Sequence, residues 1–365
     1  LEGGRLDRTK VRGREEENNK VLVGMSGGVD SAAAAALLQE AGYEAVGCTL
    51  RLHDGGASGA EDAQAVAKRL GIAFEEAGFG GAFRQEVMDE FVEGYRAGRT
   101  PNPCIQCNRR VKFNALLSRA DELGIWYIAT GHYARVEFDG GLRRWRLLRS
   151  ADCKKDQSYV LYPLSQTVLS RLLLPIGSYD KAGIRAIAEA RGFRNANRPD
   201  SQDICFIPDG DYTAFLQAYG GLELVPGDFV DTSGRVLGRH RGLPCYTTGQ
   251  RRGLGVSADR PLYVLRKNSA NNTVVLGDEA ELYSRSVWSE AFNWVSLPPQ
   301  TEPLKVTAKT RYSQTEASGV LYSEGDGTVR VVFDVPQRAV TPGQSLVAYQ
   351  GEAVVGGGVI SGAEP

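Results

Sequence analysis

The glycine-rich sequence GMSGGVDS, residues 24–31, has the composition of a loop that binds an anion. It follows a short apolar run and precedes an alanine- and leucine-rich run, so a strand, a turn and a helix are expected in that order. Glycines in such a turn let consecutive backbone N–H groups converge on a phosphate, and the helix N-terminus adds partial positive charge. The loop lacks the lysine of a Walker A site, which excludes that class. A turn that serves only tight packing is the structural alternative.

Two cysteines lie in the sequence TPNPCIQCN, residues 100–108, where their neighbours favour reactive thiols. The two prolines are expected to stiffen an irregular loop over residues 99–108 and to present Cys104 and Cys107 at the start of a helix near residues 109–123. We expect the helix N-terminus and the guanidinium groups of Arg109 and Arg110 to lower the pKa of both thiols. A structural zinc knuckle is the alternative, but no second cysteine pair has a suitable spacing.

A third candidate, Cys205, lies in the sequence SQDICFI, although a lone cysteine among apolar residues is more often a small buried hydrophobe. Three histidines are too few for a histidine-based metal site. We expect His53 to be solvated and His240 to be a surface group or to lie near phosphate. The cysteines without a partner at motif spacing are expected to be structural, namely Cys48, Cys153 and Cys245.

The elements that would position these residues alternate between strand and helix. We predict strands at residues 20–25, 44–50, 73–79 and 126–129, helices at residues 31–41, 60–70, 82–97, 109–123 and 181–191, and a hairpin across residues 139–141. The alternation predicts a parallel sheet with helices on its faces, and ligands of such sheets bind beyond the carboxyl ends of the strands. The segments 24–31 and 130–132 both lie at such ends.

Beyond residue 221 the helical periodicity is lost, and turn residues recur about every 8–12 residues, which predicts all-β structure. The predicted fold is therefore α/β. We place a disordered extension at residues 1–19, a parallel-sheet domain at residues 20–211, a small β-rich linking domain at residues 212–278 and a C-terminal β-barrel at residues 279–365.

The composition of the 365 residues, 42% apolar and 24% charged, is that of a globular protein with two or three domains. No apolar run approaches the roughly 18–20 residues that a membrane span needs, so we expect a cytosolic protein with no membrane partner. Six cysteines are too few for a disulfide scaffold.

The net charge of −1 conceals an uneven distribution. Residues 99–155 and residues 235–267 each carry a net charge of +7, so the remaining residues carry −15. Basic blocks on an acidic body are typical of a polyanion site, because the attraction to phosphate is local at Debye lengths of about 8–10 Å. Solvated arginine-rich faces are the alternative.

Eight motifs occur here in the same order as in bacterial-type tRNA-specific 2-thiouridylases, a family that this chain resembles over about residues 20–360. They are SGGVDS, GRTPNPCIQCN followed by KF, ATGHY, KDQSY, DICFI, GRHRGLPCYTTGQRRGLG, KTRY and TPGQS. The resemblance implies a PP-loop domain of the adenine nucleotide alpha hydrolase type. It also implies ATP-dependent 2-thiolation of the wobble uridine 34 of tRNA. In that reaction the C2 oxygen is adenylated and sulfur comes from a cysteine persulfide or from cluster-bound sulfide, which gives 2-thiouridine, AMP and pyrophosphate.

The resemblance also implies site residues and partners, position by position. The residues implied to bind ATP, which enters with Mg²⁺, are Gly24, Met25, Ser26, Gly27, Gly28, Val29, Asp30, Ser31, Leu50 and Gly131. Cys107 is the implied nucleophile and Cys205 the implied persulfide carrier, acting through a transient disulfide or a released sulfide. The residues implied to contact tRNA are Asn102, Pro103, Cys104, His132, Lys155, Asp156, Gln157, Arg311, Tyr312 and Gln344. The implied partners are tRNAs for Lys, Glu and Gln and a cysteine desulfurase or sulfur-relay protein.

One position departs from the family pattern. Cys104 stands where many members have an aspartate that is interpreted as an acid/base group. A thiol can still exchange a proton, but Cys104, Cys107 and Cys205 can instead supply three ligands to a [4Fe–4S] cluster with one open iron position. Both interpretations are open at this point.

Two other functions are compatible with parts of the sequence. Another PP-loop enzyme acting on a small molecule would explain residues 26–31, but not the cysteine motifs, the basic blocks or the all-β region. A tRNA-binding protein with a vestigial nucleotide site would bind tRNA without consuming ATP. Pyrophosphate release that depends on added tRNA distinguishes all three.

Neutralising Arg251 and Arg252 together is expected to weaken tRNA binding and to reduce its dependence on salt, because two phosphate contacts would be lost. Filter binding at several salt concentrations measures both effects, and ATP affinity should be unchanged. An unaltered tRNA affinity would contradict the assignment of residues 235–267 to a polyanion site.

Overall fold

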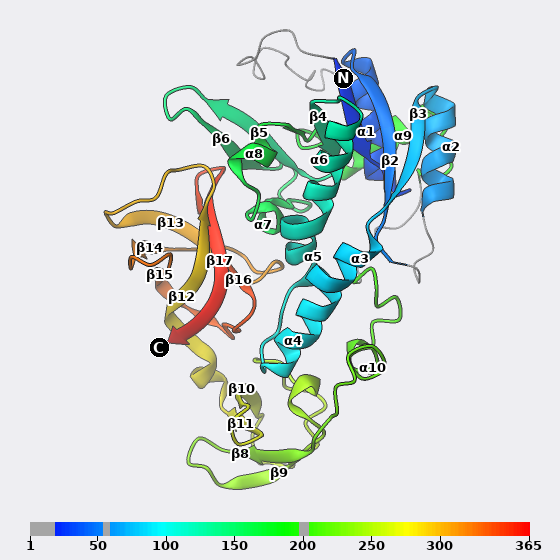
Figure 1. The fold of residues 1–365 in the computed structure, drawn as a ribbon. Helices are drawn as coiled ribbons and strands as arrows, with labels where there is room; N and C mark the ends of the chain where they lie inside the picture. The colour runs from blue at the N-terminus through cyan, green and yellow to red at the C-terminus, as the bar shows by residue number, and fades with distance from the viewer. Residues whose placement is uncertain (1–18, 54–58, 197–203) are drawn as a thin grey trace.

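A five-stranded parallel sheet organises the N-terminal part of the chain in this computed structural model, which describes residues 19–53, 59–196 and 204–365 (Figure 1). The strand order is β3-β2-β1-β4-β7, with β1 Lys20–Gly24, β2 Glu44–Arg51, β3 Ala73–Gly78, β4 Tyr127–Thr130 and β7 Leu172–Leu173. All neighbours are parallel. The four predicted strands are confirmed. Because β4 lies beside the central β1, the segments that follow both strands meet at one edge of the sheet.

Alternate residues of β1 are buried against different helices. Val21 and Val23 belong to a core shared with α1 Val29–Glu40, α2 Ala60–Leu70 and α9 Lys181–Ala190. Leu22 belongs to a second core that includes Leu116 of α6 Phe113–Glu122. This is the period of two that a strand imposes. The sheet is therefore covered on both faces, and the helices predicted at residues 31–41, 60–70 and 181–191 are confirmed.

The helix predicted at residues 82–97 contains a wider turn. It consists of α3 Gly80–Phe83, a π-helical segment Arg84–Asp89 and α4 Glu90–Arg96, and Figure 1 shows it leading away from the parallel sheet. A second π-helical segment, Cys107–Lys112, joins α5 Pro103–Gln106 to α6. Such turns are rare and are frequent at functional sites.

An irregular loop is predicted over residues 99–108, but this is wrong from residue 103 onward, because α5 begins at Pro103. The side-chain oxygen of Asn102 accepts hydrogen bonds from the N–H groups of Cys104 at 3.1 Å and Ile105 at 3.4 Å. A proline at the first helical position loses no hydrogen bond, since its N–H would have no partner there. Cys104 and Cys107 therefore lie on the first turns of a helix.

A four-stranded sheet follows α10 Tyr212–Ala218 and forms the lower end of the molecule in Figure 1. Its order is β10-β11-β8-β9, with β8 Gly227–Val230, β9 Val236–His240, β10 Tyr263–Asn268 and β11 Thr273–Gly277. His240 is buried here: its Nε2 lies 3.0 Å from the carbonyl oxygen of Asn272, and its Nδ1 accepts from the N–H of Gly242 at 3.0 Å. The prediction of a surface or phosphate-proximal His240 is wrong, because backbone groups satisfy both ring nitrogens.

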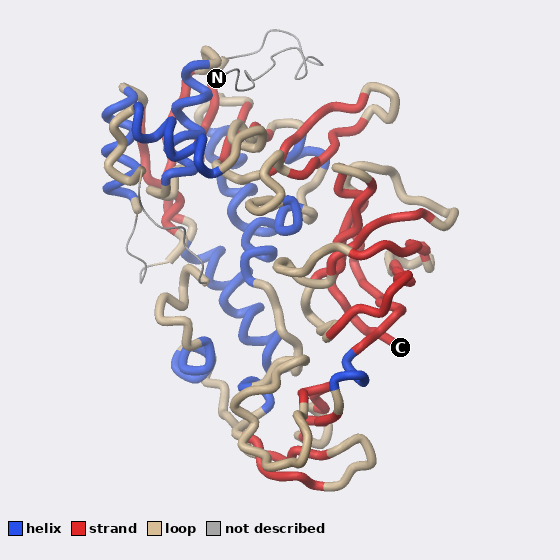
Figure 2. The backbone as a smooth tube through the Cα atoms, turned by 180° about the vertical axis from the view of Figure 1, so that it is seen from behind, coloured by secondary structure: helices blue, strands red, loops and turns tan. Residues whose placement is uncertain are grey.

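Six antiparallel strands close into a barrel in the C-terminal part of the chain. They are β12 Tyr283–Trp294, β13 Leu304–Lys309, β14 Ala317–Ser323, β15 Val329–Arg338, β16 Ser345–Gln350 and β17 Ala353–Glu364. Pairing of β12 with β17 closes the order β12-β15-β14-β13-β16-β17. The predicted hairpin is confirmed as β5 Ala134–Asp139 and β6 Arg144–Arg149, and Leu148 of β6 pairs with Ala353 of β17. A hairpin of the first domain thus extends the barrel sheet, and Figure 2 shows the two side by side.

Ion pairs with acidic residues of the same chain neutralise part of the positive charge of both basic blocks. The paired residues of the first block are Arg110, Arg119, Arg135, Arg146 and Arg149, and those of the second are Arg235, Arg239 and Arg260. Arg251 and Arg252 are exposed and form no ion pair with any described residue. The charge available to a polyanion is therefore smaller than the net charge of each block. Arg251 and Arg252 contribute to the charge that stays available.

Two expectations concern the chain as a whole. None of the helices in the described ranges has the length and apolar character needed to cross a membrane. The extension expected at residues 1–19 lies outside the described residues, apart from Asn19.

Candidate active site

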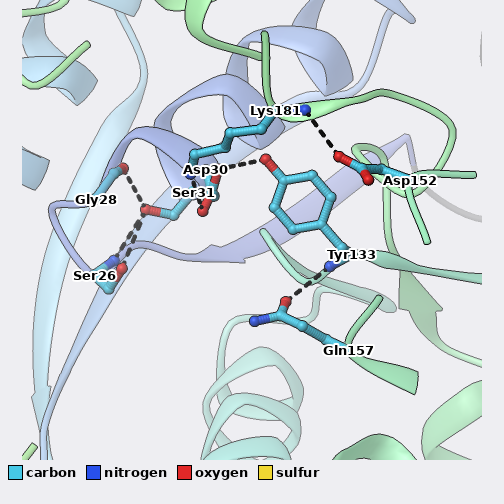
Figure 3. A network of polar contacts seen from close by, with 8 residues as sticks. All are labelled: Ser26, Gly28, Asp30, Ser31, Tyr133, Asp152, Gln157 and Lys181. Carbon is cyan, nitrogen blue, oxygen red and sulfur yellow. Dashed lines mark hydrogen bonds and ion pairs between the residues drawn. The ribbon is translucent and has the colours of Figure 1, made fainter. Parts of the chain in front are cut away.

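The loop between β1 and α1, which we call the cradle, is closed by contacts among Ser26, Gly28 and Ser31 (Figure 3). Gly27 has a φ of +78°, a conformation that favours glycine. The Ser31 Oγ donates to the Gly28 carbonyl at 3.1 Å and accepts from the Ser26 N–H at 3.2 Å, which ties the two ends of the loop together. No side chain caps α1 at Gly28, so its first N–H groups are available to a ligand. This geometry suits a phosphate at the helix N-terminus.

The segment that follows β4 packs directly against this cradle. A Cβ atom on Gly131 would lie 2.6 Å from the carbonyl carbon of Asp30 and 2.6 Å from the backbone nitrogen of Ser31. A Cβ atom on Gly27 would lie 2.3 Å from the carbonyl oxygen of Gly59. Close backbone approach therefore requires glycine at both positions, and the ATP contact of Gly131 stays a prediction.

Two residues that sequence reasoning did not select hold Asp30 in place. The Lys181 Nζ lies 2.8 and 2.9 Å from the two carboxylate oxygens of Asp30, and the Tyr133 hydroxyl donates to one of them at 2.8 Å (Figure 3). The ammonium group neutralises a carboxylate that would otherwise repel a bound phosphate. Tyr133 is part of the ATGHY motif, but Lys181 lies 151 residues from Asp30 and carries no motif signal.

Two other predicted ATP residues have different surroundings. Met25 is 2% exposed; its N–H donates to the Cys48 carbonyl at 2.8 Å and its carbonyl accepts from the Thr49 hydroxyl at 2.7 Å. Leu50 is half-buried and packs against the second core of the sheet. Met25 therefore supports the path of the loop from within, whereas Leu50 keeps a partly exposed apolar surface near the end of β2.

Cys104 and Cys107 have raised rather than lowered pKa values. Desolvation of the sulfur is the largest cause for both thiols, although Cys107 is a buried residue and Cys104 an exposed one, and the positive charge of Lys112 opposes it. Arg110 instead pairs with Glu86 at 3.2 Å. The prediction of low thiol pKa values is wrong, because desolvation outweighs the helix N-terminus and the nearby cations. Both thiols are therefore protonated at neutral pH in the free protein.

Cys205 is exposed, and its neighbour Phe206 anchors it in an aromatic cluster. The Phe206 ring centroid lies 5.7 Å from that of Phe83, 5.6 Å from that of Phe91 and 5.0 Å from that of Phe215. The buried Cys107 belongs to the same cluster.

The fold also brings the three motif thiols together. Although Cys205 is an exposed residue, desolvation of its thiol by the surrounding protein raises its pKa to about 11, and the nearby sulfurs of Cys107 and Cys104 add to the increase. Residues 201–203, the first three of the Cys205 motif, lie outside the described residues.

The cysteine site lies where the first domain meets the barrel. The Gln344 side chain donates to the Thr100 carbonyl at 2.7 Å, and the Thr100 N–H donates to the Pro342 carbonyl at 3.1 Å. The Tyr312 hydroxyl donates to the Asp156 carbonyl at 3.3 Å, and Cys104 is close enough to contribute to the raised pKa of Tyr312. Two predicted tRNA contacts from the barrel thus flank the cysteine helix.

Several other predicted tRNA contacts have partners within the chain. The buried Asp156 carboxylate accepts from the Ser150 N–H and from the N–H and hydroxyl of Ser158. The Gln157 side-chain oxygen accepts from the Tyr133 N–H at 2.9 Å. The Arg311 guanidinium donates to the carbonyls of Thr248 and Ala339 and to the Thr341 hydroxyl. These side chains stabilise the domain junction, and Lys155 beside them is half-buried.

His132 follows Gly131 and packs against the start of α6, the helix that continues from the cysteine segment. Its Nδ1 lies 2.7 Å from the Thr130 hydroxyl, and its ring centroid lies 5.8 Å from that of Phe113. Burial, assisted by Lys112, holds the pKa of His132 well below its ordinary value. The imidazole is therefore neutral at pH 7, so any contact with RNA is a neutral hydrogen bond.

The described residues contain no group of three His, Cys, Asp or Glu side chains placed to hold a metal ion. The three neighbouring thiols therefore form no ready-made ligand set, and the tentative cluster ligands Cys104, Cys107 and Cys205 stay a prediction.

Three family models match successive parts of the chain. They are the tRNA methyl transferase HUP domain at residues 19–209, the tRNA methyl transferase PRC-barrel domain at residues 213–278 and the aminomethyltransferase beta-barrel domain at residues 284–360. The chain is 49% identical over 354 residues to the tRNA-specific 2-thiouridylase MnmA of Acetivibrio thermocellus, which covers 93% of this chain and 99% of that protein. It is 48% identical over 356 residues to the MnmA of Halothermothrix orenii, which covers 94% of this chain and 99% of that protein.

Among solved structures, the U34-tRNA thiolase NcsA from Methanococcus maripaludis with its [4Fe-4S] cluster matches at a TM-score of 0.35 and 20% identity. The match covers 57% of this chain and 70% of that chain. A similarity this low carries no inference about a cofactor here.

Replacing Lys181 with methionine is expected to weaken ATP binding at least ten-fold, because the Asp30 carboxylate would face the phosphates without its counter-charge. Isothermal titration of ATP into the variant measures the effect. Lys20→Met is the matched control, since it removes an exposed lysine that pairs with Glu44 at 3.7 Å at the opposite end of β1. Equal ATP affinity of Lys181→Met and the wild type would contradict this role.

The raised pKa of Cys205, about 11, predicts slow alkylation at neutral pH in spite of its exposure. Only the thiolate reacts, so the rate should rise about ten-fold per pH unit from pH 7 toward 11. Iodoacetamide labelling of chelator-treated protein, resolved peptide by peptide by mass spectrometry, measures the profile for each cysteine. A plateau below pH 9 for Cys205 would show that burial does not control this thiol.

Proposed function

The chain belongs to the family of tRNA-specific 2-thiouridylases, and from this premise we propose that it is a sulfurtransferase that uses ATP to thiolate C2 of uridine 34 in tRNA. The observation that carries the proposal is the proximity of two thiols that differ in exposure. Cys107 is buried in the aromatic cluster, and the exposed Cys205 lies between its members Ile204 and Phe206, close enough that Cys107 adds to the raised pKa of Cys205. The segment after β4 packs on the phosphate cradle through Gly131, and its His132 lies against Phe113 at the start of α6, the helix that continues from the cysteine segment. Nucleotide activation and sulfur delivery thus have separate but adjoining sites.

Activation uses the cradle and its charged support. The C2 oxygen of the uridine attacks the α-phosphorus of ATP, a P–O bond breaks, and pyrophosphate leaves with the bonding electrons. Mg²⁺ bound to ATP would offset phosphate charge. The free N–H groups at the start of α1 stabilise the negative charge that develops, because they are already oriented. Lys181 keeps Asp30 from opposing that charge.

Sulfur delivery uses the difference in exposure between the two thiols. Cys205 is accessible to a donor such as a cysteine desulfurase or a relay protein, which would leave a persulfide on it. The terminal sulfur of the persulfide attacks C2 of the adenylated uridine, and AMP leaves with the C–O bonding electrons. Cys107 then loses its proton and attacks the Cys205 sulfur, which releases 2-thiouridine and leaves a Cys107–Cys205 disulfide.

A second route of sulfur transfer uses the same two thiols and oxidises them to the same extent. Cys107 attacks the Cys205 sulfur first and displaces hydrosulfide, which then attacks C2. Both routes leave the same disulfide, which an external dithiol must reduce before the next turnover. A [4Fe–4S] cluster held by Cys104, Cys107 and Cys205 would instead supply a bound sulfide, but the described residues contain no preformed group of three ligands for it.

The tRNA reaches this site at the junction of the first domain and the barrel. Tyr312 is 43% exposed beside Cys104, and Arg251 and Arg252 are exposed in the linking domain. The target base must be turned out of the anticodon stack to reach a buried thiol, and the exposed arginines can hold the phosphates on either side. The proposed substrates are the tRNAs for Lys, Glu and Gln.

Cys205→Ser is expected to lower 2-thiouridine formation at least a hundred-fold while tRNA-dependent pyrophosphate release continues, because activation does not need this thiol. Mass spectrometry of nucleosides and a pyrophosphate assay on the same reaction measure the two steps. Cys153→Ser, at another exposed thiol, is the matched control and should thiolate normally.

Full thiolation by Cys205→Ser would overturn the role of Cys205. Pyrophosphate release by the wild type without any tRNA would favour a PP-loop enzyme acting on a small molecule. Binding of tRNA without any pyrophosphate release would favour a non-catalytic tRNA-binding protein.

A further inference from the structure

Asn195 contacts the phosphate cradle from a distant part of the chain. Its side-chain Nδ2 donates to the Gly27 carbonyl at 2.8 Å across 168 residues of sequence. Asn195 is 5% exposed, and its Oδ1 is a buried atom that has no partner among the described residues. The Asn195 side chain is thus held at the loop through its Nδ2 group alone. No motif of the sequence includes this residue.

The contact determines which way one peptide group faces. A trans peptide is planar, so its C=O and N–H point in opposite directions. Because Asn195 draws the Gly27 carbonyl toward itself, the N–H of Gly28 in the same peptide points away from Asn195. That N–H has no partner among the described residues. It is therefore free to bind an anion in the cradle.

The Gly27–Gly28 peptide is also the peptide of the loop whose plane can rotate most easily. Glycine lies on both sides of it, so no Cβ atom resists rotation, and Gly27 already has a φ of +78°. The next carbonyl, that of Gly28, is held within the loop by the Ser31 hydroxyl at 3.1 Å. The Gly27 carbonyl depends on a donor from outside the loop.

We propose that Asn195 is a positioning residue for the phosphates of ATP, which holds the Gly27–Gly28 peptide so that the Gly28 N–H faces the nucleotide. The inference rests on the proposed ATP site and adds to it a residue that acts through the backbone of the cradle. Without the Asn195 donor, the Gly27–Gly28 peptide plane flips in a fraction of the molecules. The flipped peptide then presents the Gly27 carbonyl oxygen to the phosphates.

The test compares ATP and adenosine binding to the full chain by titration. Asn195→Ala is expected to weaken ATP binding at least ten-fold and to leave adenosine binding within two-fold, because adenosine has no phosphate to contact the cradle. Asn195→Asp keeps the shape but replaces the donor with a carboxylate, so it should weaken ATP binding further. Gln39→Ala is the control, since the Gln39 amide donates to the Leu70 carbonyl at 2.8 Å in the same domain, away from the cradle.

The outcomes separate this inference from the function on which it rests. Selective loss of ATP affinity in both Asn195 variants, with tRNA affinity unchanged, supports the inference. Wild-type ATP affinity in either correctly folded variant overturns it and leaves the proposed function intact. Equal loss of ATP and adenosine affinity also overturns it, since that pattern indicates general damage to the site. A wild-type chain that does not bind ATP would overturn both.

Discussion

Desolvation of the thiols is the constraint on which the organisation of this site depends. Cys107 is buried in an aromatic cluster where the loss of water outweighs the charge of Lys112, so its pKa is raised. A protonated thiol is a poor nucleophile and is protected from chance oxidation in the free protein. The site therefore needs a change in its surroundings before Cys107 reacts. Under the proposed function, the target base and its adenylate would supply this change, because they bring the polar groups that the cluster lacks.

Three consecutive residues after β4 connect the phosphate cradle with the start of α6, the helix that continues from the cysteine segment. Gly131 packs on the backbone of Asp30 and Ser31, His132 lies against Phe113 within the influence of Lys112, and Tyr133 donates to Asp30. Because neighbouring parallel strands end at one edge of a sheet, a single short segment reaches both places. The arrangement requires no flexible arm between activation and sulfur transfer. It also explains why a substitution at Gly131 would disturb the cradle rather than the core.

The features that follow from local pattern were predictable from the sequence, whereas those that depend on distant segments were not. The four strands and the helices α1, α2 and α9 follow from apolar periodicity within each element. The start of α5 was missed because proline also occurs in loops, and the Asn102 cap decides between the two. The sign of the thiol pKa shift depends on Phe83, Phe206 and other rings from separate segments. Lys181 and Asn195 reach the cradle across 151 and 168 residues, a distance at which spacing in the sequence carries no information.

The internal contacts of the expected tRNA-binding residues limit how the RNA can bind. Asp156 and Arg311 are held by several hydrogen bonds each, and breaking these would leave buried polar groups without partners at a cost of about 1–3 kcal/mol per group. RNA therefore gains more by using exposed atoms that are free than by displacing these contacts. Arg251 and Arg252 of the linking domain offer such atoms. Tyr312 of the barrel offers an exposed ring, although its hydroxyl donates to the Asp156 carbonyl. Under the proposed function, binding across both of these domains would place the anticodon over the junction where Cys104 and Cys107 begin their helix.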